Sequence, residues 1–299
     1  MDAAGLPRIP REKVEEYLTR NQRSAASLLA AFHALDDTNY LHEAAAKFPN
    51  GPHLQWTVLA RDAFPEERRK WLDLFKTSSP DNSLANYLSA ADHFKNGQTE
   101  AGIQELLEAS RKKKFKDYAM DAMLEEQELG RAAGRTPLEA VQVAGWGEDL
   151  FPELGTLKKL AHDIGDAQKQ HLGAGDSASA NNLVQMELTL ADRLTTEEGG
   201  RMMLNLQVGI SIEALSLRQL DQNARYDFLG GKTPSERLAF LKQAGASLRE
   251  LQHDFTAAYP KMTEAEVLSF NDLWKTYGEA EALRWVQQRF GTNVPGSGP

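Results

Sequence analysis

The chain has 299 residues, no cysteine and a formal net charge of −9. The lack of cysteine excludes disulfides, Cys-ligated zinc, iron–sulfur clusters and a thiol nucleophile. The acidic balance argues against nucleic-acid binding, which needs clustered positive charge, and no apolar run reaches the ~18 residues of a membrane-spanning helix.

The first 23 residues predict a short lead and one helix. Pro10 suits the first position of a helix that reaches about Arg20. Ser24 is a good cap for the next helix, in which Leu28 and Phe32 fall on one face. A run of helical hairpins is expected from this point onward.

The stretch from residue 24 to residue 144 repeats itself with a period of 31 residues. A fixed period of this size indicates stacked helical units, because one unit cannot bury its apolar face alone. A bulky residue that faces a small one lets neighbouring helices approach closely. The repeating columns are aromatic (Trp56, Tyr87, Tyr118), small (Ala60, Ala91, Ala122) and apolar (Leu41, Leu72, Ile103 and Ala44, Phe75, Leu106).

These residues resemble the tetratricopeptide repeat (TPR) family. The first-helix pattern of that family is similar to Trp56/Leu59/Ala60/Ala63 and Tyr87/Ala90/Ala91/Phe94, and its Gly-containing turn is similar to residues 96–101. Departures are the period of 31 instead of 34 and Ala63 in place of an aromatic, so a related helical-hairpin solenoid is the alternative. The resemblance implies an α–α hairpin solenoid over about residues 24–144, with a concave face that binds a protein or peptide.

The repeat register implied by the resemblance gives a set of expected partner-binding positions. They are the first-helix residues that are not needed for packing between units. The set is Arg61, Asp92, Lys95, Asn96, Glu126 and Gln127.

A fourth unit is expected to begin with a long helix from Phe115 to Leu129. A shorter partner helix follows over residues 137–143, and the sequence at 145–149 then breaks the pattern. The repeat region is therefore expected to end near residue 144.

Residues 150–290 predict a further, more acidic helical region. The apolar segment 203–217 is expected to be its buried centre, and residues 233–236 read as a helix start with a cap and a proline. One last helix is expected from Thr263 to about Phe290, and residues 291–299 form a flexible tail. The prediction is thus an all-α chain, divided into 1–23, 24–144, 150–290 and 291–299.

No catalytic, cofactor-binding or metal-ligating residues are identified. The seven histidines lack ligand spacing, and the chain has no Gly-x-Ser-x-Gly, Walker or Gly-x-Gly-x-x-Gly motif. The carboxylates at 125, 126, 128, 148 and 149 could supply an acid–base pair, but solvated acidic helix faces are commoner.

The sequence therefore predicts a non-enzymatic helical repeat scaffold that binds a protein or peptide partner on its concave face. One alternative is an all-α enzyme with a site at the junction of the two halves, near Trp146, Glu148, His162 or His171. Another is a cell-envelope or membrane-associated assembly scaffold without its leader. The compartment stays open: the chain reads as soluble, either cytoplasmic or exported after removal of a leader.

Overall fold

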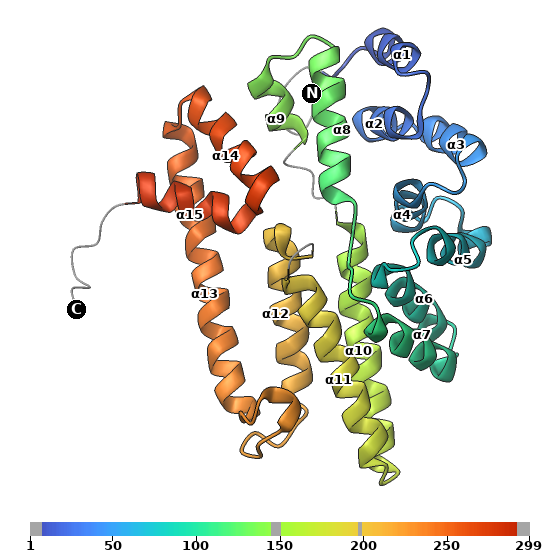
Figure 1. Cartoon of the computed structure of the whole chain (residues 1–299), viewed down its shortest axis with the longest axis vertical. Helices are drawn as coiled ribbons and strands as arrows, with labels where there is room; N and C mark the ends of the chain where they lie inside the picture. The colour runs from blue at the N-terminus through green and yellow to red at the C-terminus, as the bar shows by residue number, and fades with distance from the viewer. Residues whose placement is uncertain (1–7, 145–150, 197–198, 292–299) are drawn as a thin grey trace. The chain divides into compact units, whose positions relative to one another are not determined.

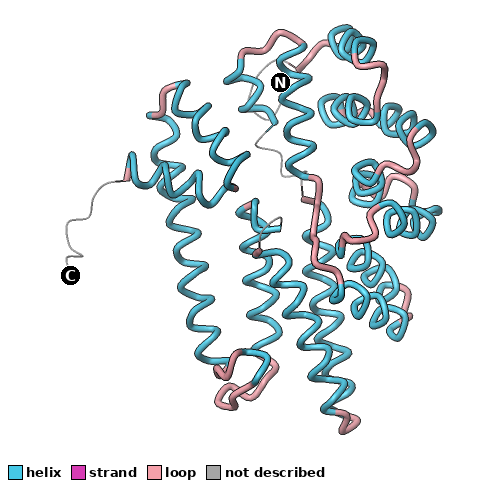
Figure 2. The backbone as a smooth tube through the Cα atoms, in the orientation of Figure 1, coloured by secondary structure: helices cyan, strands magenta, loops and turns pink. Residues whose placement is uncertain are grey.

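The computed structural model describes residues 8–144, 151–196 and 199–291. These residues form helices joined by short loops, and no strand occurs within them (Figure 2). The all-α prediction is confirmed. The chain divides into two compact units, Met1–Thr189 and Leu190–Pro299. The expected boundary at 145–149 lies outside the described residues.

Consecutive helices of the first unit pack in pairs. The pairs are α2 with α3, α4 with α5, α6 with α7 and α8 with α9, an arrangement compatible with a helical-hairpin solenoid. The bounds are α1 (Arg11–Arg20), α2 (Ala25–Leu35), α3 (Thr38–Lys47), α4 (Pro52–Ala60), α5 (Arg68–Ser78), α6 (Ser83–Lys95), α7 (Thr99–Arg111), α8 (Ala119–Ala132), α9 (Pro137–Ala144) and α10 (Pro152–Gly173). Helix α11 (Ser177–Thr195) begins in the first unit and ends in the second.

Capping side chains and prolines begin several of these helices, and the cap expected at Ser24 is one of them. Ser24 accepts a hydrogen bond from the backbone N–H of Ser27 at the start of α2. At α6 the cap is Asn82, whose side chain accepts a hydrogen bond from the backbone N–H of Leu84. Pro52 and Pro152 occupy first-turn positions of α4 and α10, where their missing N–H costs nothing.

Most residues of the repeating columns lie in the core of the first unit. Trp56 and Tyr87 are buried in the middle of α4 and α6, and Ala44, Phe75 and Leu106 are fully buried on the paired helices. Large side chains at these positions remove apolar area from water along the whole row of hairpins. The packing role is confirmed for these five residues, whereas Ala60, Ala91 and Ile103 of the same columns are only half-buried.

The fourth unit differs from the expectation. Tyr118 adopts a left-handed conformation (φ 59°), so α8 begins at Ala119 rather than at Phe115. Asp117 Oδ1 accepts a hydrogen bond from the Ala119 N–H at this start. Tyr118 therefore lies before the helix, and its ring centroid is 6.3 Å from that of Trp56 and 6.1 Å from that of Phe75.

Helices α8 and α10 cover one side of the hairpin row. Helix α8 packs against α2, and α10 packs against α6. In Figure 1, α3 and α5 lie on the side of α2 and α4 that is turned away from α8. We call the covered surface of α2, α4 and α6 the inner face.

The second unit contains α12 (Met203–Leu217), α13 (Pro234–Ala258), α14 (Glu264–Tyr277) and α15 (Glu279–Phe290). Thr233 forms a capping box with Glu236, and Thr263 forms one with Glu266. The sequence at residues 233–236 predicts the first of these two caps.

Two expectations for the second unit are wrong. The single last helix is broken at Gly278, whose φ of 90° suits glycine and ends α14. Helix α12 is buried on one side only: Leu204 is 41% exposed, and Leu206 and Ile210 line an open groove. An apolar composition all round the helix does not by itself show complete burial.

Candidate functional site

Ionisable side chains gather on the inner face of the first unit. His33 comes from α2, His53 from α4, Glu125 and Glu126 from α8, and Glu153 from the first turn of α10. Together with Arg61, the C-cap of α4, these residues form what we call the buried polar network. The network is enclosed because α8 packs against α2 and α10 packs against α6.

His53 and Glu125 are the pair at its centre. Nδ1 of His53 lies 3.3 Å from Oε1 of Glu125. The imidazole stacks on the Tyr118 ring at 5.5 Å with an interplanar angle of 9°, and the Trp56 ring lies 5.8 Å away. Burial raises the pKa of Glu125, and His53 partly opposes that rise. Both the His53 Nε2 and the Glu125 Oε2 are buried without a hydrogen-bond partner.

His33, Arg61 and Glu126 form the second part of the network. Burial lowers the pKa of His33 to about 3, and the charge of Arg61 adds to this effect. Burial raises the pKa of Glu126 to about 8, although Arg61 opposes the change. The Arg61 guanidinium carbon lies 5.7 Å from the centre of the Phe32 ring. At neutral pH His33 is thus uncharged, and much of Glu126 keeps its proton.

Glu153 adds a fully enclosed carboxyl group. Its side chain is 1% exposed, and burial raises its pKa well above the usual range. The neighbouring Asp117 raises it further, whereas the Trp56 indole partly offsets the rise. A carboxyl group in this setting stays protonated and can donate a hydrogen bond.

The network has the chemistry of a proton donor and acceptor site. It combines a His–carboxylate pair with two carboxyl groups that hold protons near neutral pH. Such shifted groups tend to cluster at functional sites, although structural networks also produce them. Within the described residues, no group of three or more His, Asp or Glu side chains is arranged to hold a metal ion.

The structure separates the six expected partner-binding residues into two places. Arg61 and Glu126 belong to the buried polar network, and Gln127 is buried beside them in α8 at 1% exposure. Asp92, Lys95 and Asn96 lie at the carboxyl end of α6, where Lys95 and Asn96 are exposed. The single concave surface expected for all six is thus two distinct regions.

Sequence reasoning missed most of the network. His33 and His53 lack ligand spacing, and Glu125 reads as part of a solvated acidic face. Glu153, next to Pro152, has the pattern of an ordinary first-turn acid. No local signal marks these residues, because the contact between His53 and Glu125 joins segments far apart in the chain.

An open groove lies near the end of α6, which we call the inner groove. It has a volume of about 420 Å³ and is bounded by the ends of α4 and α6, the start of α5 and one side of α10. Small side chains keep it open, since a methyl group at Gly155 would have no heavy atom within 4 Å. The lining residues are Leu59, Ala60, Asp62, Arg68, Ala91, Asp92, Lys95, Gly155, Thr156, Lys159 and Asp163.

Most charges of the inner groove are already paired. Arg68 Nη1 lies 3.1 Å from Asp62 Oδ1, and the carboxylate of Asp92 is bound by Arg68 and by Arg69 at 2.5 Å. Lys159 pairs with Asp163 at 2.8 Å. Lys95 is the one lining cation with no ion pair to any part of the chain that the structure describes.

Only two residues of the alternative junction site, His162 and His171, lie within the described part of the chain. Trp146 and Glu148 lie outside the described residues, His162 is exposed on α10, and His171 contacts Asp176 at 3.2 Å. None of the described helices has both the length and the apolar character needed to cross a membrane.

No protein-family model matches the chain, and the searches of curated proteins and of solved structures also found no match.

Proposed function

We propose that the chain is a non-enzymatic protein-binding scaffold, and that its partner docks in the inner groove rather than along the whole inner face. The observation that supports this most directly is that α8 and α10 already cover the inner face, while the inner groove stays open. Two residues expected to contact a partner, Asp92 and Lys95, line this groove.

The charges of the groove favour an acidic side chain on the partner. Asp62, Asp92 and Asp163 each have a cationic neighbour, so Lys95 is left as the positive charge available for a new contact. An ion pair between Lys95 and this acidic side chain would chiefly set the orientation and the association rate of the partner. The small residues Ala60, Ala91 and Gly155 provide room for an apolar side chain of the partner.

Site-specific photo-crosslinking tests the proposal. A crosslinking amino acid replaces Lys159, which lines the groove, or as a matched control Lys158, which is exposed on the same helix but does not line it. We expect a discrete crosslinked protein from position 159 only. Gly155→Trp, which fills the groove, should abolish it, whereas Gly155→Ala should not. Equal labelling at both positions, or a product insensitive to Gly155→Trp, would count against the groove.

A second candidate function is acid–base catalysis at the buried polar network, because His53 Nε2 is unpartnered while Nδ1 faces Glu125. Incubation of the protein with a metabolite extract, followed by untargeted mass spectrometry, tests this. Substrate consumption that is lost in both His53→Gln and Glu125→Gln would support catalysis. No consumption by the wild-type protein would remove this candidate.

A further inference from the structure

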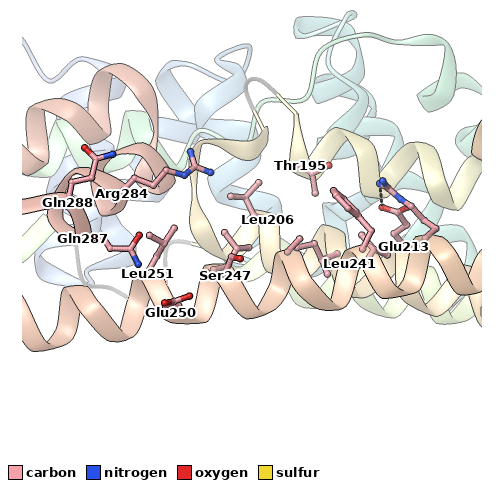
Figure 3. A pocket seen from close by; sticks show the side chains of 15 residues that line it. Thr195, Leu206, Glu213, Leu241, Ser247, Glu250, Leu251, Arg284, Gln287 and Gln288 are labelled. Atoms are coloured by element: carbon pink, nitrogen blue, oxygen red, sulfur yellow. Dashed lines mark hydrogen bonds and ion pairs between the residues drawn. The ribbon is translucent and has the colours of Figure 1, made fainter. Parts of the chain in front are cut away.

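The second unit has a groove of its own, formed by α12, α13 and α15 with Thr195 at the end of α11 (Figure 3). Its volume is about 520 Å³, within the range of ligand-binding clefts. We call it the second-unit groove. It is independent of the inner groove, since every lining residue belongs to Leu190–Pro299.

The apolar lining of this groove follows helical spacing. Helix α13 contributes Leu241, Ala244, Leu248 and Leu251, which recur every three or four residues along one face. Helix α12 adds Leu206 and Ile210, one turn apart. The side chains in Figure 3 form a row along α13 rather than a round pocket. From Arg237 to Leu251 this row is about 21 Å long at 1.5 Å per residue, or about four helical turns.

An exposed aromatic ring lies at one end of the row. Phe240 lines the groove and is 56% exposed, with the Arg237 guanidinium carbon 4.9 Å from the ring centre. An exposed ring beside an apolar groove is typical of an interaction site. Covering this ring would add apolar burial to any docked partner.

The charged residues at the groove favour one sign of charge on the partner. Arg237 is bound by Glu213, with Nη2 3.0 Å from Oε2, and Arg284 is bound by Glu281. Glu250, by contrast, has no ion pair with any residue in the described ranges. The available charge is therefore negative, and it favours a cationic group on the partner at the Glu250 end.

The helical walls of the groove also favour one secondary structure in the partner. The backbone N–H and C=O groups within α12 and α13 are used in their own helices, so the groove has no edge for an extended chain to pair with. An extended peptide would find no backbone partner in these walls, whereas a helix satisfies its backbone groups internally. The negative charge of Glu250 also disfavours a fatty-acid carboxylate at this end.

We propose that the second-unit groove binds an amphipathic α-helix of a partner protein, with apolar anchors spaced over about four turns and a Lys or Arg near Glu250. This site goes beyond the proposed function, since it lies in the other unit and selects a basic rather than an acidic partner. A negative binding result at one groove therefore does not bear on the proposal for the other groove.

Fluorescence polarisation with the full chain tests the proposal. The probe is a fluorescein-labelled helical peptide of about four turns (~15 residues), with Leu along one face and Lys elsewhere. A peptide of the same composition in scrambled order and an amphipathic Leu/Glu peptide serve as comparisons. Ala244→Trp fills the groove, and Ala246→Trp is its matched control, because Ala246 is exposed on the same helix outside the groove. Gly155→Trp controls for the other groove.

The expected result is binding of the Leu/Lys peptide only, weakened at least about tenfold by Ala244→Trp, which is about 1.4 kcal/mol, and unchanged by Ala246→Trp or Gly155→Trp. Glu250→Lys should shift the preference toward the Leu/Glu peptide without preventing folding. Equal binding of the scrambled peptide would overturn the proposal. So would displacement of the probe by palmitate, or a dimer of the chain that Ala244→Trp dissociates, because these outcomes assign the groove to an acyl chain or to a second copy.

Discussion

Replacement of Glu126 by Gln should stabilise the first unit in a pH-dependent way. Burial raises the pKa of this carboxyl group from 4.5 to about 8 in the folded chain. Between these two pH values the native state keeps a proton that the unfolded state releases. The native state then binds more protons than the unfolded one, so the wild-type protein loses stability as pH rises through this window.

The size of the effect follows from the width of the window. At 1.36 kcal/mol for each pH unit, the full difference is about 5 kcal/mol. The side chain is partly accessible to water, and we therefore expect Glu126→Gln to gain about 2–4 kcal/mol at pH 9. Below pH 4.5 the carboxyl group is neutral in both states, and the gain should vanish.

Urea unfolding at pH 4, 6.5 and 9 measures this gain, with hydrogen exchange of α8 amides to identify the transition that includes this helix. Glu108→Gln is the control, because Glu108 is exposed and paired with Arg111 on the surface. Its effect should stay below about 0.5 kcal/mol at each pH. A gain from Glu126→Gln that is the same at pH 4 and pH 9, or absent at both, would refute the assignment of a buried, protonated carboxyl group.

Three further predictions concern packing and local structure, and urea unfolding measures the first and third. Gly209→Ala should destabilise the second unit by about 1–3 kcal/mol, because the new Cβ would lie 2.9 Å from the backbone oxygen of Ala191; Gly155→Ala, which has open space, should instead stabilise by up to about 1 kcal/mol. Asn82→Ala removes side-chain hydrogen bonds of 2.9 and 3.0 Å to the backbone of residue 116, so limited trypsin digestion should cut the Lys-rich loop 112–116 sooner, and unchanged cutting would contradict an anchoring role. Thr263→Ala should cost about 1 kcal/mol through loss of the capping box, and no loss would show that the cap is dispensable.

Helical periodicity identifies the core of the first unit but not the path of its chain. The spacing of Trp56 and Tyr87 reports which helix faces are apolar, and those faces are buried. Tyr118 continues the same spacing and is also buried, yet it lies outside a helix in a left-handed conformation. A repeat period therefore places a side chain in the core without fixing the backbone around it.

The buried polar network was beyond sequence analysis for a related reason. Glu125 and Glu126 belong to an acidic stretch that has the pattern of a solvated helix face. They are enclosed because α8 packs against α2. Whether a helix stacks beside its predecessor or lies across it depends on long-range packing, which a single sequence does not reveal.

The composition of the inner face is hard to explain by stability alone. Enclosing Glu125, Glu126 and Glu153 costs free energy that apolar side chains of similar size would not cost. The same surface contains aromatic residues that pack well, so polar side chains are not required to fill the space. Residues that reduce stability are expected where a surface has a function besides folding. The region around His53 is thus the part of the first unit in which a chemical role is best sought, while the open groove at Lys95 is the part best suited to docking.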